Sequence, residues 1–157
     1  MQIMADGGLI VSRVQLALNV EDLESSIDFY TKLFQVPPAK VRDGYANFAI
    51  ADPPLKLVLF AGAGEPGSLN HLGVEVETQA EVAATVTRAE ASDLACDVQS
   101  STTCCYAVQD KVWVEGPDNA WEFYTVLADA PTLQSDGGCC VTDAATDTPT
   151  EAAACCA

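Results

Sequence analysis

Two adjacent cysteines, Cys104 and Cys105, have the clearest chemical potential of any residues in this sequence. Neighbouring cysteines can close only a strained eight-membered ring, whereas structural disulfides join Cα atoms that lie farther apart than one peptide step. Two thiolates side by side can instead bind one soft metal or metalloid atom together. The pair therefore predicts capture of a thiophilic ion, and the alternative is that both side chains are small buried hydrophobic residues.

The other cysteines follow the same pairing. The chain has seven cysteines, which form three adjacent pairs and one single residue: Cys96, Cys104–Cys105, Cys139–Cys140 and Cys155–Cys156. Secreted disulfide frameworks usually have an even number of separated cysteines, and the first ten residues here lack a basic, apolar signal segment. We therefore predict a reducing, cytoplasmic location. No apolar run approaches the length that crosses a membrane.

Two further residues have the chemistry of metal ligands. His71 is the only histidine in the chain, and it lies in a segment of alternating polar and apolar residues. A lone histidine in a strand is more often simply packed than bound to a metal. Glu122 follows a Pro-Asp-Asn turn and sits in an otherwise apolar segment. An inward carboxylate at that position is costly unless it has a partner such as a metal, and the alternative is that Glu122 faces outward.

Two similar half-domains must position these candidates. Residues 14–20 and 70–76 both alternate as half-buried strands do, and an amphipathic helical pattern follows each of them. Further strand-like segments then follow each helix, at 45–50 and 55–60 in the first half and at 106–114 and 121–127 in the second.

Aligning the halves on Leu16 and Leu72 gives an offset of 56 residues, which places Gln15 on His71. Two halves of this kind can pair their sheets around a common cleft, so Gln15 and His71 are predicted to face each other. Together with Glu122 they would offer an amide oxygen, an imidazole nitrogen and a carboxylate to one ion. This set is similar to the facial triad of non-haem iron sites, with an amide in place of one histidine. Because a neutral amide is a weaker ligand than imidazole, we expect modest affinity for Fe(II), Mn(II) or Ni(II).

Composition bounds the class of protein and its partners. The chain of 157 residues is long enough for one domain, and its 49% hydrophobic content is ordinary for a globular protein. Its charge is unusual, because 7 basic and 23 acidic residues give a net charge of −16. Such a charge excludes nucleic acid and anionic membranes as partners and favours a small neutral or cationic ligand.

The two ends of the chain differ from its centre. Residues 129–157 contain five acidic residues, no Lys or Arg, and otherwise mostly small side chains, which is typical of a disordered tail. We predict a disordered extension at residues 1–11, a folded domain at 12–128 with halves at about 12–63 and 68–128, and a disordered tail at 129–157. The tail cysteine pairs are either flexible thiols that capture metal or the result of drift in an unconstrained segment.

Several stretches of this sequence resemble a known family. The double pattern of strand, helix and strands, with candidate ligands on the first strand of each half, looks like the vicinal oxygen chelate superfamily of glyoxalase I, bleomycin-resistance proteins and extradiol dioxygenases. The segments VSRVQLALNVEDLESSIDFYTKLF, LNHLGVEVE and TTCCYAVQDKVWVEGPDNAWEFYTV more narrowly resemble organoarsenical carbon–arsenic lyases and the similar cadmium-inducible proteins. The resemblance implies an α+β fold of two βαβββ modules.

The resemblance also implies a function. It is that of an Fe(II)-dependent dioxygenase that cleaves the carbon–arsenic bond of trivalent organoarsenicals such as methylarsonous acid and releases arsenite, with dioxygen as co-substrate. By position, Gln15, His71 and Glu122 would hold iron, and Cys104 and Cys105 would hold arsenic. Many relatives have histidine at the position of Gln15, although glutamine also occurs. The protein would act as a monomer or homodimer.

Other interpretations compete with this one. A non-enzymatic protein could sequester arsenite or cadmium with the same cysteines, and a third possibility is a glyoxalase-like or drug-binding member of the superfamily. Cys104 and Cys105 can grip one atom only if they lie in a loop or bulge before the strand at Tyr106, because neighbours in a regular strand point to opposite faces. We expect Lys111 at the surface, and the alternative is that it lowers the pKa of nearby thiols. Gln109 and Tyr106 are predicted to line the pocket.

Overall fold

The structure is a computed structural model that describes residues 12–134. Its elements in chain order are β1 (Arg13–Val20), α1 (Leu23–Phe34), β2 (Lys40–Arg42), β3 (Tyr45–Ile50), β4 (Leu55–Ala61), β5 (Leu69–Glu75), α2 (Gln79–Ala91), β6 (Cys96–Cys104), β7 (Ala107–Val114) and β8 (Trp121–Asp129). The predicted α+β fold of two βαβββ halves is confirmed. Neither helix in the described range is both long and apolar enough to cross a membrane.

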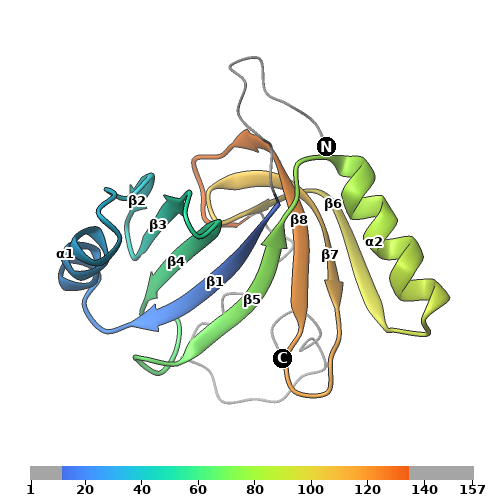
Figure 1. Ribbon diagram of the computed structural model, residues 1–157, viewed down its shortest axis with the longest axis horizontal. Coiled ribbons are helices and arrows are strands. Elements are labelled where there is room, and N and C mark those ends of the chain that lie inside the picture. Colours follow the sequence, from blue (N-terminus) through green and yellow to red (C-terminus); the bar gives the residue numbers. More distant parts are fainter. Residues whose placement is uncertain (1–11, 135–157) are drawn as a thin grey trace.

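All eight of these strands form one mixed sheet in the order β2-β3-β4-β1-β5-β8-β7-β6. The first strands of the two halves, β1 and β5, pair antiparallel at its centre, and each pairs on its other side in parallel with the last strand of its own half. In Figure 1 the helices lie at opposite ends of the fanned sheet, with β1 and β5 side by side between them. The two halves are therefore related by an approximate twofold axis through the central strand pair.

The pairing of β1 with β5 confirms the offset of 56 residues. Leu16 pairs directly with Leu72, while Gln15 pairs with Gly73 and Ala17 with His71. Gln15 and His71, which are equivalent in the repeat, therefore lie diagonally across the central strand pair and on the same face of the sheet. This register places Gln15 beside His71, as expected.

The two helices cover the opposite face of the sheet. Helix α1 begins at the N-cap Asp22, whose side chain accepts a hydrogen bond from the backbone of Ser25, and its apolar residues pack on Phe48 and Leu57. Helix α2 begins with a capping box between Thr78 and Glu81 and packs on β7 through a second apolar cluster. Because strand side chains alternate, Gln15, His71 and their neighbours project from the face without helices.

The described part of the chain continues beyond the predicted boundary at Ala128. Strand β8 ends at Asp129, and Ala130 then donates a backbone hydrogen bond to Tyr106 while the carbonyl of Leu133 accepts one from Cys105. Leu133 also packs against the core cluster that contains Ala17. One apolar side chain and backbone pairing therefore join residues 129–134 to the folded domain, and the bounds of the tail stay a prediction. Residues 1–11 and the cysteine pairs at 139–140 and 155–156 lie outside the described residues.

Candidate metal and thiol site

Three side chains from three neighbouring strands converge at the centre of the sheet. Gln15 comes from β1, His71 from β5 and Glu122 from β8, and all three side chains are largely buried. Gln15 Nε2 lies 3.0 Å from His71 Nε2 and donates to Glu122 Oε2 at 3.2 Å. His71 Nε2 and Glu122 Oε2 are also 3.2 Å apart. The structure thus brings together all three ligands predicted from the sequence.

Gly73 allows this close approach. It pairs with Gln15 on one side and with Glu122 on the other, so it occupies the centre of the row. A Cβ atom at this position would lie 2.9 Å from the Glu122 carbonyl oxygen and 3.5 Å from Gln15 Nε2. A side chain larger than glycine would therefore push Glu122 away from Gln15. Sequence reasoning missed this residue, although a glycine inside an alternating strand often marks a close approach of backbone segments.

The neighbours of His71 fix the orientation of its ring. His71 Nδ1 is 2.7 Å from the side-chain oxygen of Asn70, which can only accept a hydrogen bond, so Nδ1 carries the proton. The lone pair of Nε2 consequently faces Gln15 and Glu122. The ring of Trp113 packs edge-on against the imidazole at 5.5 Å between centroids. This arrangement is the one that metal-bound histidines usually have.

Lys111 lies in the interior, contrary to the surface position expected from the sequence. It is 1% exposed, and its ammonium is 2.5 Å from Glu122 Oε1. Burial raises the pKa of Glu122, but the positive charge of Lys111, the largest opposing cause, lowers this pKa to about 2. Glu122 is therefore ionised at neutral pH, with one oxygen held by Lys111 and the other facing His71.

The adjacent cysteines lie where β6 turns into β7. Cys104 ends β6, and Cys105 and Tyr106 have φ values of 55° and 59°, a left-handed pair of the kind that tight hairpins require. Residues with a Cβ pay on the order of 1 kcal/mol each for this conformation. The turn brings the two Sγ atoms to 3.4 Å. The two sulfur atoms are thus close enough to bind one atom together, as a turn at this position was expected to allow. The strained backbone of Cys105 and Tyr106 accompanies this geometry.

The two cysteines differ in their chemical state. Cys105 is a free, half-buried thiol, and burial raises its pKa to about 12 although the nearby charge of Lys111 opposes this change. The thiol is therefore protonated at neutral pH, and Lys111 does not activate it overall. Cys104 is 2% exposed and is disulfide-bonded in this structure, so its thiol becomes available on reduction.

Residues of the first half hold this turn in place. Lys40 donates to the carbonyl of Tyr106 at 2.9 Å, and the guanidinium of Arg42 lies 5.8 Å from the centre of the Tyr106 ring. The rings of Tyr45 and Tyr106 are 5.3 Å apart. These contacts join the hairpin of the second half to β2 and β3, so the cysteines are presented toward the central strands.

A cavity of about 270 Å³ connects the two groups of candidates. Gln15 and Cys105 both line it, together with Gln109 and the ion-paired residues Lys56 and Glu75. The predicted pocket position of Gln109 agrees with this lining, whereas Tyr106 is not among the lining residues. A small molecule bound here could contact the amide ligand and a thiol at the same time.

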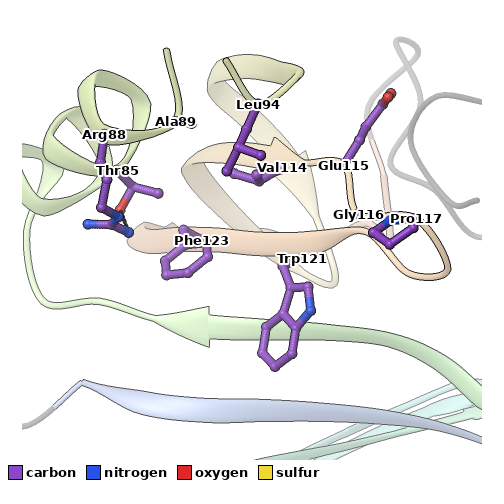
Figure 2. Close-up of a pocket in the computed structure, with 10 residues that line it drawn as sticks. All are labelled: Thr85, Arg88, Ala89, Leu94, Val114, Glu115, Gly116, Pro117, Trp121 and Phe123. Carbon is purple, nitrogen blue, oxygen red and sulfur yellow. Dashed lines mark hydrogen bonds between the residues drawn. The ribbon is translucent and has the colours of Figure 1, made fainter. Parts of the chain in front are cut away.

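A larger cavity on the helix-covered face has a different character. It measures about 410 Å³ and lies between α2 and the strands β7 and β8. Figure 2 shows Trp121 and Phe123 projecting from β8 in this region, with Arg88 and Thr85 reaching from the helix. None of the five predicted site residues lines this cavity, so the chemistry of the sequence motifs does not lie there.

The central donor set fits a divalent metal ion. Residues 12–134 contain no group of three or more His, Cys, Asp and Glu side chains placed to hold a metal, so any such site here depends on the amide of Gln15. The lone pairs of His71 Nε2 and Glu122 Oε2 both face the end of the Gln15 side chain, so an ion between the three side chains would lie within reach of each. Across the twofold axis, the equivalent of Glu122 is Val58, because Val58 pairs with Ala17 as Glu122 pairs with Gly73. Three ligands and an apolar fourth position would leave coordination positions open.

Comparisons with known proteins agree with this fold. Residues 12–123 match the model of the glyoxalase/bleomycin resistance protein/dioxygenase superfamily. Among solved structures, a Mn(II)-bound glyoxalase from Novosphingobium aromaticivorans superposes with a TM-score of 0.55 at 15% identity, covering 76% of this chain and 42% of that one. Homoprotocatechuate 2,3-dioxygenase from Arthrobacter globiformis also gives 0.55, at 20% identity, covering 79% of this chain and 38% of that one. At these identities the likeness shows the fold alone.

Closer relatives exist among characterised sequences. A trivalent organoarsenical cleaving enzyme of Thermomonospora curvata is 60% identical over 83% of this chain and 89% of its own length. Cadmium-induced protein CadI of Mycobacterium tuberculosis is 58% identical over 80% of this chain and 83% of its own length. A second trivalent organoarsenical cleaving enzyme, from Bacillus sp., is 41% identical over 82% of each chain.

Proposed function

The chain belongs to the glyoxalase/bleomycin resistance protein/dioxygenase superfamily, and we propose that it cleaves the carbon–arsenic bond of trivalent organoarsenicals such as methylarsonous acid, releasing arsenite. The observation that carries this proposal is the shared cavity, because Gln15 of the ligand set and Cys105 of the thiol pair both line it. Relatives at 60% and 41% identity named as trivalent organoarsenical cleaving enzymes support it. We place this activity in the reducing cytoplasm.

The thiol pair captures the substrate in this proposal. When Cys104 is reduced, the two thiols exchange with the two hydroxyl groups of methylarsonous acid, so two arsenic–sulfur bonds form and two arsenic–oxygen bonds break. Each thiol proton leaves with a hydroxyl group as water, and the exchange involves no change of oxidation state. A protonated Cys105 thiol, with a pKa of about 12, suits this balance because no thiolate has to be formed in advance. Arsenic is soft and prefers these sulfur ligands.

The triad holds the catalytic metal in the same proposal. Gln15, His71 and Glu122 bind Fe(II), and the iron, when bound, supplies the activation of dioxygen as co-substrate. Asn70 keeps the proton of His71 on Nδ1, so that Nε2 is free to bind. Lys111 holds Oε1 of Glu122 and leaves Oε2 for the metal. The protein therefore presents one nitrogen and one oxygen ligand in a fixed orientation beside the cavity.

A second candidate function is sequestration of arsenite or cadmium without turnover. The 58% identity to cadmium-induced protein CadI favours it, since that name describes induction by a thiophilic metal. Sequestration needs the thiol pair but has no use for the convergence of Gln15, His71 and Glu122 on one point. We therefore rank it second.

Product analysis tests the proposal. Reduced protein is loaded with Fe(II) under anaerobic conditions and incubated with methylarsonous acid with and without air, and arsenic species are separated by chromatography with elemental mass detection. We expect arsenite only in air, no arsenite from Cys104→Ser, and iron binding close to wild type in that variant. Arsenite release without oxygen, or undiminished release by Cys104→Ser, would remove the mechanism. Bound arsenic without any arsenite product would favour sequestration.

A further inference from the structure

Tyr124 contacts the metal-ligand set without belonging to it. It lies on β8 two residues after Glu122 and is 1% exposed. Its hydroxyl donates to Gln15 Oε1 and also lies 2.9 Å from Glu75 Oε2. The other end of the Gln15 amide, Nε2, points at His71 and Glu122. Tyr124 therefore stands directly behind the ligand amide.

The amide of Gln15 is turned the wrong way round to bind a metal ion in this structure. A metal ion binds an amide through its oxygen, yet Gln15 presents its NH₂ group to the other two ligands. A half-turn about the last side-chain bond would exchange the two ends. The oxygen would then join His71 and Glu122, and the NH₂ group would face Tyr124.

Tyr124 can satisfy either end of the amide, but it is better matched to the turned one. In the present arrangement its single hydroxyl proton is shared between two acceptors, Gln15 Oε1 and Glu75 Oε2. After the half-turn, the hydroxyl gives its proton to Glu75 and accepts one from the amide, so each group has a partner. Because no proton is shared between two acceptors in the turned arrangement, the hydrogen bonds favour the orientation in which the amide oxygen of Gln15 faces the metal.

Glu75 is the acceptor that fixes the direction of the hydrogen bonds running from Gln15 through Tyr124 to Glu75. Burial raises its pKa, but Lys56 and Arg13 outweigh burial, and the pKa is lowered overall. Lys56 lies 2.7 Å and Arg13 2.9 Å from its two oxygens. Glu75 is therefore ionised at neutral pH and can only accept, which commits the hydroxyl of Tyr124 to donate toward it.

We propose that Tyr124, oriented by Glu75, is a positioning residue that turns the amide oxygen of Gln15 toward the bound metal. This inference rests on the metal site of the proposed function. It explains how a glutamine, whose amide can point either way, serves as a ligand in a buried site. Tyr124 acts through Gln15 and touches neither metal nor substrate.

The test measures metal affinity rather than activity. Reduced, metal-free Tyr124→Phe and wild-type proteins are titrated anaerobically with Fe(II) against a fluorescent chelator. Losing one net hydrogen bond in the bound form should weaken affinity about three- to tenfold. Tyr45→Phe is the matched control, because Tyr45 is equally buried but its hydroxyl partners Asn47 instead of Gln15, and its Fe(II) affinity should equal that of wild type.

A double-mutant cycle separates positioning from a general loss of structure. In a Gln15→Ala background, Tyr124→Phe should weaken Fe(II) binding no further, since the amide that it orients is gone. An equal loss with and without Gln15 would overturn the inference. So would wild-type affinity in Tyr124→Phe, while the metal site of the proposed function would survive. Absence of Fe(II) binding by the wild type would overturn both.

Glu75→Gln carries the test if Tyr124→Phe does not fold. A glutamine at position 75 can donate to the hydroxyl of Tyr124, which would then donate to Gln15 and favour the orientation with the amide nitrogen toward the ligands. Fe(II) affinity should again fall about three- to tenfold. Unchanged affinity in this variant would contradict the proposed role of the hydrogen-bond chain.

Discussion

Replacing Lys111 with methionine tests whether its ion pair with Glu122 is the electrostatic centre of the site. Lys111 is 1% exposed, and its ammonium lies 2.5 Å from Glu122 Oε1. Methionine keeps most of the apolar stem but removes the charge, so Glu122 stays buried without its main cationic partner. Removing one partner of a buried ion pair typically costs about 3 to 5 kcal/mol. We expect a loss of this size in the free energy of unfolding of the metal-free protein at pH 7.

The predicted loss in the free energy of unfolding should depend on pH in a characteristic way. Burial raises the pKa of Glu122, but the positive charge of Lys111, the largest opposing cause, lowers it from 4.5 to about 2. A carboxyl group with a lower pKa in the folded chain stabilises the fold above the unfolded value of 4.5, and that contribution is lost as the pH falls toward 2. The contribution amounts to about 3 kcal/mol. Without Lys111, burial dominates, the pKa of Glu122 rises, and ionisation of this carboxyl destabilises the fold at neutral pH. The two proteins should therefore differ most near pH 7 and least near pH 2, where the carboxyl group is protonated in the unfolded chain and half protonated in the folded wild type.

Urea denaturation followed by tryptophan fluorescence, repeated from pH 2 to pH 8, measures this difference. Lys32→Met is the control, since Lys32 pairs with Asp28 on the surface of α1 with the two side chains 73% and 63% exposed. Its loss should change the free energy of unfolding by no more than about 0.5 kcal/mol. A metal-loaded Lys111→Met protein should recover part of its stability, because the ion supplies positive charge beside Glu122. A stability difference that does not vary with pH would refute the reasoning.

Three further outcomes follow from the structure. His71→Ala should abolish binding of the divalent metal, which elemental analysis of anaerobically loaded protein can check, and full occupancy would contradict the site. Gly73→Ala should weaken Fe(II) affinity at least about tenfold, because the added Cβ meets the backbone of Glu122, and chelator competition measures this. A chain ending after Gln134 should have the melting temperature of the whole protein, whereas one ending after Ala128 should melt several degrees lower. Calorimetry compares the two truncated chains. Equal melting temperatures would show that residues 129–134 add no stability.

Periodicity was sufficient to predict the elements that carry the site. The alternating segments at 14–20 and 70–76 are β1 and β5, and the offset of 56 residues survives as the direct pairing of Leu16 with Leu72. The edge strands β2 and β6 gave no comparable signal. They lie at the two ends of the sheet and carry mostly polar side chains that are exposed or half-buried, so neither apolar alternation nor a buried run marks them in the sequence.

The residues that sequence reasoning misjudged or left open depend on tertiary contacts. A lysine in a strand is normally at the surface, and only the buried carboxylate of Glu122 makes the interior position of Lys111 tolerable. The left-handed turn at Cys105 and Tyr106 contains no glycine or asparagine, the residues that usually indicate such a turn in a sequence. Contacts from Lys40 and Leu133, which lie far away in the sequence, hold that turn instead.

The distribution of basic residues shows how an acidic chain builds this site. Only 7 of 157 residues are basic, and five of those seven contribute to ion pairs around the site: Arg13–Glu75, Lys56–Glu75, Lys40–Asp129, Arg42–Asp129 and Lys111–Glu122. All except the last join the first half of the domain to the second. The scarce positive charges therefore hold the two halves together at the seam where the cavity lies. Because each of these cations already has a carboxylate partner, the cavity suits a ligand that carries no full negative charge, as trivalent arsenic with neutral hydroxyl groups does.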